Sequence, residues 1–142
     1  MSCCAWLMAV AAVALSAWVH AADLRIHLVG LRNTQGSLRL SLYDSAETFL
    51  QADERLANVK IARIWSNPVF ICFASLPPGT YAVTVHHDEN NDGQINRNLL
   101  GIPREGYGFS NDAQGIVGPP SFAKAAVTLA QTDEVITITL RY

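Results

Sequence analysis

Cysteine is scarce in this sequence of 142 residues, which contains only Cys3, Cys4 and Cys72. Two of the three lie at the extreme N-terminus, ahead of a segment that we interpret below as a removable signal. The chain that follows the signal keeps Cys72 alone, which excludes a disulfide framework within it. Because the neighbours of Cys72 in residues 69–73 are apolar, we expect Cys72 to be a small buried hydrophobic residue.

Positive charge is also limited, with 10 Lys and Arg against 12 Asp and Glu and a formal net charge of -2. No cluster of basic residues is present that could neutralise a run of phosphates. The sequence therefore argues against a nucleic-acid partner.

Catalytic signatures are missing as well. The sequence has no Gly-x-Ser-x-Gly elbow, no Cys-x-x-Cys, no His-Glu-x-x-His and no phosphate-binding glycine-rich loop. These absences favour a non-enzymatic protein, and the remaining enzyme hypothesis depends on isolated residues that are described below.

The N-terminus resembles a secretory signal. Residues 5–18 form an uncharged apolar run that ends near Ala21 and Ala22, small residues of the kind that signal peptidase accepts. We predict a signal peptide at residues 1–21, cleaved after Ala21 or alternatively after Ala22, and a periplasmic or secreted protein. The alternative is that the segment stays attached as a membrane anchor. With the signal removed, no stable membrane span is expected.

Most of the remaining sequence has apolar residues at a period of two, which is typical of half-buried strands. We expect about seven short strands, at residues 24–29, 38–43, 59–65, 69–76, 80–87, 125–129 and 135–140. The first two should form a hairpin, because residues 32–36 have the composition of a turn that ends in Gly36. Residues 45–58 break the pattern and offer a short helix or helical turn. The predicted fold is an all-β, antiparallel β-sandwich, with residues 22–142 forming a single domain.

One long segment, residues 88–122, lacks a sustained period of either kind. Structureless loops of this length are uncommon in compact domains and are usually functional or disordered. Apolar residues argue against disorder, and we expect them to anchor the loop over one end of the sandwich: Leu99, Leu100, Ile102, Tyr107, Phe109, Ile116, Val117 and Phe122. The sequence therefore predicts one ordered loop as the functional unit.

The first nine residues of this loop match a calcium-binding pattern. That pattern needs oxygen ligands at positions 1, 3, 5, 7 and 9, which are here Asp88, Asn90, Asp92, Gln94 and Asn96. It also needs glycine at position 6 and an apolar residue at position 8, which are Gly93 and Ile95. Position 12 should be a bidentate Glu, but the sequence has Leu99. Glu105 or Asp112 could complete the ligand shell by folding back. The cofactor expected here is weakly bound calcium, and a metal-free turn in which the side chains bond their own backbone is the alternative.

A second possible metal site involves the histidines that precede the loop. Adjacent residues on a strand point to opposite faces, so at most one of His86 and His87 could join Asp88 and Glu105 in a zinc- or copper-type site. The same groups with Ser110 would form the alternative to a binding protein, a small metal-dependent or serine hydrolase. A packed or solvated histidine at the end of a strand is the simpler interpretation.

The candidate interaction segment lies later in the same loop. It consists of four residues, Tyr107, Phe109, Ser110 and Asn111. The two aromatic residues, separated by Gly108, could supply a platform for a sugar or peptide. Packing against the sandwich is the structural alternative.

The loop also carries a family resemblance. His-Asp-Glu-Asn-x-Asp-Gly at 87–93, Gly-Ile-Pro-x-Glu-Gly-Tyr-Gly-Phe-Ser-Asn at 101–111 and Pro-Pro-Ser-Phe at 119–122 resemble an uncharacterised family of small exported bacterial proteins, domain of unknown function 2141. The resemblance covers nearly all of the chain after the signal. It implies a bacterial envelope or secreted location and is consistent with a transthyretin-like or immunoglobulin-like sandwich, but it implies no activity.

From these observations we expect an exported, non-enzymatic binding or structural module of the bacterial envelope. Its partner would be an envelope protein or a glycan, with no nucleic acid. A purely structural envelope protein, whose loop is rigid only for packing reasons, is a further hypothesis. The sequence leaves the oligomeric state open.

Overall fold

A computed structural model of the protein describes residues 20–142, so residues 1–19 of the predicted signal peptide, 1–21, lie outside the described residues. This part of the chain forms eight strands, a 3-10 turn and one short helix. In chain order they are β1 (Ala22–Val29), β2 (Ser37–Tyr43), β3 (Ala57–Ile61), β4 (Val69–Leu76), β5 (Gly79–Asp88), β6 (Gly106–Phe109), η1 (Ser110–Asp112), α1 (Phe122–Ala125), β7 (Val127–Leu129) and β8 (Glu134–Thr139). Among residues 20–142, no helix has the length and apolar character needed to cross a membrane.

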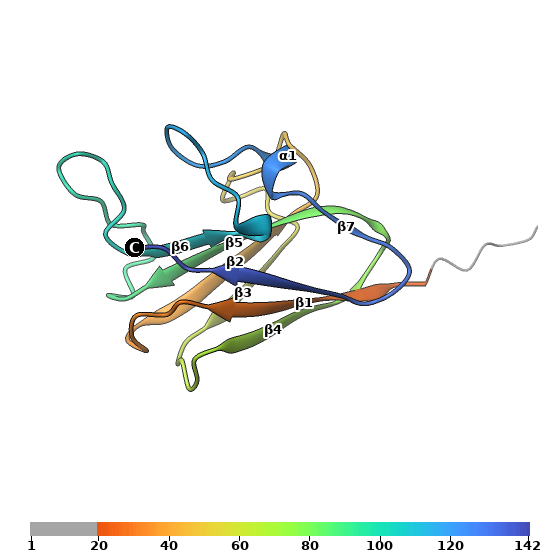
Figure 1. Ribbon diagram of the computed structural model, residues 1–142, viewed down its shortest axis with the longest axis horizontal. Helices are drawn as coiled ribbons and strands as arrows, with labels where there is room; N and C mark the ends of the chain where they lie inside the picture. The colour runs from red at the N-terminus through yellow and green to blue at the C-terminus, as the bar shows by residue number, and fades with distance from the viewer. Residues whose placement is uncertain (1–19) are drawn as a thin grey trace, which may run out of the picture.

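The strands form two sheets that face each other, which confirms the all-β prediction. One sheet has the order β4-β1-β8, and the other has the order β3-β2-β5-β6 with β7 paired to β5 (Figure 1). The expectation of purely antiparallel pairing is wrong at one place, because β1 and β8 run parallel. These two strands are the first and last of the fold, so the long intervening chain supplies the connection that parallel strands require.

The core lies between the two sheets and follows from the alternation in the sequence. In β1, Leu24, Ile26 and Leu28 are fully buried, while the residues between them are partly or fully exposed. From the other sheet, Leu40 and Val85 belong to the same apolar cluster. Burying a side chain of this size contributes about 1.5–3 kcal/mol, so this cluster is the main source of stability.

The predicted hairpin between the first two strands does not form. β1 pairs with β4 and β8, whereas β2 pairs with β3 and β5, so residues 30–36 connect the two layers. The alternation of apolar residues indicates which face of a strand is buried, but it carries no information about the partner strand. Gly36 does adopt the positive φ expected of the turn, at 71°, and a side chain there would collide with the backbone of Asp88.

For residues 45–58 we expected a short helix or a helical turn, and the described chain has turns there and no helix between β2 and β3. The first residues of this segment make the hydrogen bonds of a helix start, because the Ser45 and Thr48 hydroxyls lie 2.9 Å apart and the amide of Thr48 donates to Ser45 Oγ. Leu50 then takes a positive φ of 67°, which is incompatible with a continuing right-handed helix. The helix α1 forms instead at Phe122–Ala125.

Cys72 is exposed, contrary to the expectation that it would be buried. It lies on β4, where the burial pattern alternates and Phe70 and Cys72 point away from the core. The outward ring of Phe70 stacks on His27 of β1, with the ring centroids 4.8 Å apart. The local sequence is apolar on both sides of this strand, which explains why composition alone suggested burial.

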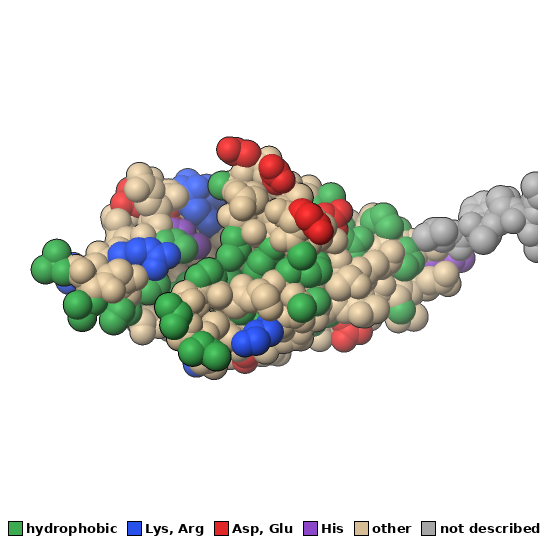
Figure 2. All heavy atoms as spheres, turned by 90° about the horizontal axis from the view of Figure 1, so that it is seen from above, with side chains coloured by type: hydrophobic (Ala, Val, Ile, Leu, Met, Phe, Trp, Pro, Cys, Tyr) green, Lys and Arg blue, Asp and Glu red, His purple; other side chains and the backbone are tan. Residues whose placement is uncertain are grey.

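The segment 88–122 is divided by β6, which pairs with β5, into two separate loops (Figure 1). Tyr107, Phe109 and Phe122 are at least partly buried, as expected of anchors. The other predicted anchors are wrong, because their side chains are exposed: Leu99, Leu100, Ile102, Ile116 and Val117. Figure 2 shows hydrophobic side chains gathered at the end of the molecule opposite the N-terminal trace, beside Lys or Arg side chains. The loops are held by polar contacts instead.

Candidate functional site

The end of β5 places two adjacent histidines on opposite faces of the sheet. His87 is fully buried, with Nδ1 2.7 Å from the Tyr142 hydroxyl and Nε2 2.7 Å from the carbonyl oxygen of Gln35. Because a carbonyl can only accept, Nε2 of His87 donates to Gln35, and in the neutral ring Nδ1 accepts from the tyrosine. Both nitrogens of His87 are therefore engaged, and His86 is the histidine that can join the carboxylates.

Glu105, which immediately precedes β6, fastens the loop to the sheet. Its side chain is buried, and its Oε2 lies 3.0 Å from Nε2 of His86. The amide of Glu89 donates to Oε1 and the amide of Asn96 donates to Oε2, each over 3.1 Å. One carboxylate thus holds the start and the middle of the 88–105 loop. Glu105 therefore lies beside the calcium-like loop, and its role as a metal ligand stays a prediction.

Asp88 is the last residue of β5 and is fully buried. Its Oδ2 accepts from Nε of Arg39 over 2.7 Å and from the amide of Gly93 over 3.0 Å. Its Oδ1 has no hydrogen-bond partner among residues 20–142. One ligand atom each from His86, Asp88 and Glu105 lies within 4.8 Å of the other two. The structure therefore brings together the three groups that the sequence singled out for a transition-metal site.

The remaining calcium-pattern residues form a closed polar turn. Nδ2 of Asn90 donates to Oδ2 of Asp92 and to Oδ1 of Asn96, over 2.9 and 2.8 Å. Oδ1 of Asp92 accepts from the amide of Gln94 over 2.8 Å. Hydrogen bonds, the largest from the Asn96 side chain, lower the pKa of Asp92 and so favour its charged form. Ile95, the apolar residue of the pattern, is 40% exposed and does not tether the loop to the core.

The two proposed completing ligands for calcium are in different situations. Glu105 contacts the loop directly through the amide of Asn96. Asp112 is committed elsewhere, because its Oδ1 accepts from the amide of Thr139 over 2.7 Å and its Oδ2 from the Thr139 hydroxyl over 3.0 Å. Asp112 therefore joins η1 to β8, and Glu105 is the one of the two that lies beside the calcium-like loop. Calcium binding itself stays a prediction.

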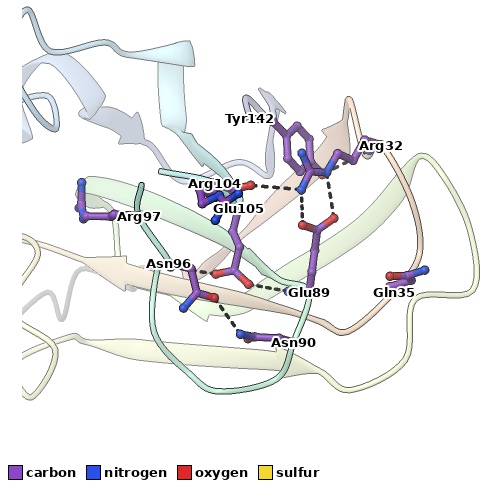
Figure 3. Close-up of a pocket in the computed structure, with 9 residues that line it drawn as sticks. All are labelled: Arg32, Gln35, Glu89, Asn90, Asn96, Arg97, Arg104, Glu105 and Tyr142. Carbon is purple, nitrogen blue, oxygen red and sulfur yellow. Dashed lines mark hydrogen bonds and ion pairs between the residues drawn. The ribbon is translucent and has the colours of Figure 1, made fainter. Parts of the chain in front are cut away.

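A polar cleft of about 830 Å³ opens next to this loop (Figure 3). It is lined by Arg32, Gln35, Glu89, Asn90, Asn96, Arg97, Arg104, Glu105 and Tyr142. These residues come from the β1–β2 connection, the 88–105 loop and the C-terminus, three segments that are far apart in sequence. The cleft holds three arginines and two glutamates, so its formal charge is positive.

One wall of the cleft is fixed by an ion pair between Arg32 and Glu89. Nε of Arg32 donates to Oε1 of Glu89 over 2.9 Å, and Nη2 bonds both the other carboxylate oxygen and the carbonyl of Arg104. The guanidinium also lies 4.3 Å from the ring centroid of Tyr142. The Arg32 hydrogen bond, aided by Asn33, lowers the pKa of Glu89. Arg32 is therefore held in place on this wall.

Tyr107 and Phe109, two of the predicted interaction residues, lie on β6. They pair with His86 and Thr84 of β5, and their ring centroids are 6.1 Å apart at a steep angle. Both rings are partly buried, and Phe109 packs against a small second apolar cluster. These contacts match the structural alternative of packing against the sandwich. An additional role in binding stays a prediction.

Ser110 and Asn111 connect η1 to neighbouring backbone. The fully buried Ser110 Oγ accepts from the amide of Val83 over 2.9 Å and donates to the carbonyl of Ala125. The Asn111 amide donates to two carbonyls within residues 124–126. The serine-hydrolase hypothesis required the Ser110 hydroxyl to meet a histidine and a carboxylate, and the structure directs it to backbone groups instead.

Sequence reasoning missed three important residues of this region. They are Arg39, Arg32 and Tyr142. Arg39 bonds Asp88, Arg32 bonds Glu89, and the Tyr142 hydroxyl bonds His87. Each contact spans at least 49 residues, and a single sequence holds no signal for such a pairing. The net positive charge of the cleft could not be predicted from the sequence for the same reason.

The comparisons with known proteins identify one family. The model of the family described as "Uncharacterized protein conserved in bacteria (DUF2141)" matches residues 26–137, so the chain belongs to this family. No curated protein and no solved structure matches the chain. The matched residues include β2, β5 and the whole 88–105 loop, and therefore nearly all of the site described above.

Proposed function

We propose that this member of an uncharacterised bacterial family is an exported, non-enzymatic binding module that recognises an acidic glycan in the cleft beside β5. The observation that carries the proposal is the composition of that cleft, which combines three arginines with amide and hydroxyl groups. Its volume of about 830 Å³ falls within the range of small-ligand sites in proteins, about 300–1,000 Å³.

The charges of the cleft favour an anionic ligand. Glu89 is neutralised by the paired Arg32, and Glu105 is satisfied by two backbone amides and His86. The other two arginines are less committed. Arg97 makes one bond to a backbone carbonyl, and the guanidinium of Arg104 has no hydrogen bond within residues 20–142. A planar guanidinium binds carboxylates through two parallel hydrogen bonds, which suits a sugar acid.

The uncharged groups of the cleft favour a ligand that is rich in hydroxyls. The Gln35 side chain presents an amide that can both donate and accept. The amides of Asn90 and Asn96 already bond each other and Asp92, and each keeps only part of its hydrogen-bonding capacity for a ligand. Tyr142 adds an aromatic ring next to Arg32. A purely apolar ligand would leave the Gln35 amide without a partner, at a cost in free energy. A saccharide that carries carboxylates satisfies both kinds of group.

Binding should be measured by calorimetry with a tetragalacturonate, an acidic sugar, and with the neutral tetragalactose of the same length. We expect binding of the acidic sugar only, weakened by added salt. Arg104→Gln should lower the affinity at least about tenfold, since a hydrogen bond to a charged group contributes about 1.5–3 kcal/mol. The matched control is Arg63→Gln, because Arg63 lies away from the cleft, over the Trp65 ring.

Equal affinity for the two sugars, or an Arg104→Gln variant that binds like the unaltered protein, would overturn the glycan proposal. Recovery of the sugar intact after long incubation is expected of a binding module. Cleavage of the sugar would overturn the non-enzymatic part. Binding of an envelope protein that is unaffected by Arg104→Gln would point to a different surface, in contradiction to the proposal.

A further inference from the structure

We propose that His86, Asp88 and Glu105 form a binding site for a divalent transition metal, of which Zn²⁺ is the best match. One ligand atom of each side chain lies within 4.8 Å of the other two. The side chains of His86 and Glu105 are 12% and 5% exposed, and that of Asp88 is not exposed at all. Two carboxylates and one imidazole therefore converge at a largely buried position.

The second observation is the unpartnered oxygen of Asp88. A buried carboxylate normally has partners for both oxygens, because burying it without them costs free energy. Here Oδ2 accepts from Arg39 and Gly93, while Oδ1 has no hydrogen-bond partner in the described chain. A metal ion is a partner that would satisfy Oδ1 without disturbing the bonds of Oδ2.

The supporting bonds match the way in which proteins orient metal-binding carboxylates. Such ligands are held by hydrogen bonds from surrounding groups, which fix their direction. The Arg39 guanidinium does this for Asp88, and the amide of Glu89 does it for Oε1 of Glu105. Both carboxylates are thus held by donors from the protein before any ion is bound.

His86 and Glu105 supply the place where the ion would sit. Nε2 of His86 lies 3.0 Å from Oε2 of Glu105, so Nε2–H donates to this carboxylate in the metal-free protein. A metal bound between the two atoms would take the place of that hydrogen, with the neutral imidazole carrying its proton on Nδ1 instead, and both atoms would become ligands. The two carboxylates and the Arg39 cation sum to one negative charge around the site, which favours a cation.

The donor set distinguishes the metal. Zn²⁺ binds imidazole and carboxylate groups, and sites with three protein ligands keep a fourth position for water. Calcium and magnesium prefer oxygen ligands alone, so the imidazole of His86 disfavours them. The calcium-like pattern at residues 88–96 shares Asp88 with this site, and Glu105 is a candidate ligand of both, but only the transition-metal site needs His86. The metal would reach the site from the cleft, which Glu105 lines.

The test is equilibrium dialysis and calorimetry with Zn²⁺ on the tag-free protein, after removal of metals by a chelator. We expect one equivalent of Zn²⁺ per chain. His86→Gln should lower the affinity at least about tenfold, because even the loss of a supporting residue has an effect of that size. The control is His27→Gln, on the other sheet, which should bind Zn²⁺ like the unaltered protein.

A spectroscopic measurement guards against a variant that fails to fold. Co²⁺ at the site should give visible absorption bands that Zn²⁺ removes, and His86→Gln should lose these bands while its far-ultraviolet circular dichroism stays unchanged. Glu105→Gln should weaken the bands as well. The proposal is overturned when no Zn²⁺ binds, when His86→Gln keeps full affinity, when His27→Gln loses it, or when Ca²⁺ displaces Zn²⁺ at equal concentration. Because the sugar test depends on Arg104, its failure would leave this site unaffected.

Discussion

The guanidinium of Arg39 lies with its Nε 2.7 Å from Oδ2 of Asp88, a carboxylate that is completely buried. Arg39 comes from the middle of β2, directly opposite His86, and reaches across to the first residue of the calcium-like loop. Gly93 closes over the same guanidinium, since a side chain at that position would come within 3.2 Å of it. The protein thus already supplies one internal cation to this loop.

Replacing Arg39 by methionine should destabilise the protein strongly. The substitution keeps an unbranched apolar stem but removes the guanidinium, and so leaves the Asp88 charge buried and unpaired. Removing one partner of a buried pair costs about 3–5 kcal/mol, and we expect the lower part of this range because the Arg39 side chain is 35% exposed. Urea denaturation of the two proteins measures the difference in the free energy of unfolding.

An ion pair on the other sheet provides the control for Arg39→Met. Arg25 bonds Asp133 at the same distance of 2.7 Å, but both side chains are about half exposed. Exposed pairs contribute about 0–1 kcal/mol, so Arg25→Met should change stability little. Similar losses in the two variants would show that burial of Asp88 does not govern the effect.

Glu89 gives the protein a stabilisation that depends on pH. Its pKa is lowered in the folded state, chiefly by the hydrogen bond from Arg32. A lowered pKa stabilises the fold fully above the ordinary pKa of about 4.5, and this stabilisation is lost as the pH falls through the folded-state value. The difference in unfolding free energy between the unaltered protein and Glu89→Gln should therefore shrink as the pH falls below about 4.5.

Chemical denaturation at a series of pH values from neutral to acid measures this dependence. Glu134→Gln serves as the control, because Glu134 is exposed at the start of β8. We expect the Glu134 variant to follow the unaltered protein at every pH. A Glu89→Gln difference that stays constant into the acid range would contradict the role of the Arg32 ion pair.

Calcium should stabilise the loop weakly if the sequence pattern is functional. For a dissociation constant of about 1 mM, typical of extracellular sites, about 10 mM calcium adds about 1.4 kcal/mol, or about 5 °C in melting temperature. Asp92→Ala should abolish the calcium-dependent part of the shift. The exposed Asp53, far from the loop in sequence, provides Asp53→Ala as the matched control. An unchanged melting temperature between chelator and calcium would exclude the calcium-braced loop.

Local chemistry in the sequence predicted the parts of this structure that depend on neighbouring residues. Alternation in β5 separated His86 from His87, and the loop pattern led to Asp88 and Glu105. What depends on distant parts of the chain could not be predicted. The parallel pairing of β1 with β8, and the meeting of Arg39 with Asp88, depend on how the sheets assemble.

At the tip of the 88–105 loop, the sequence interpretation and the structure predict different effects of the same substitution. We expected Leu99 and Leu100 to anchor the loop, in which case replacing them by serine would destabilise the protein. Their side chains are 106% and 83% exposed, so the double serine variant should stay within about 0.5 kcal/mol of the unaltered protein. Leu40→Ala, in the core, should lose about 2–5 kcal/mol in the same urea titration. A large loss in the double variant would mean that the tip packs against the sandwich in solution. An unchanged stability would leave two adjacent apolar side chains that the fold itself does not need.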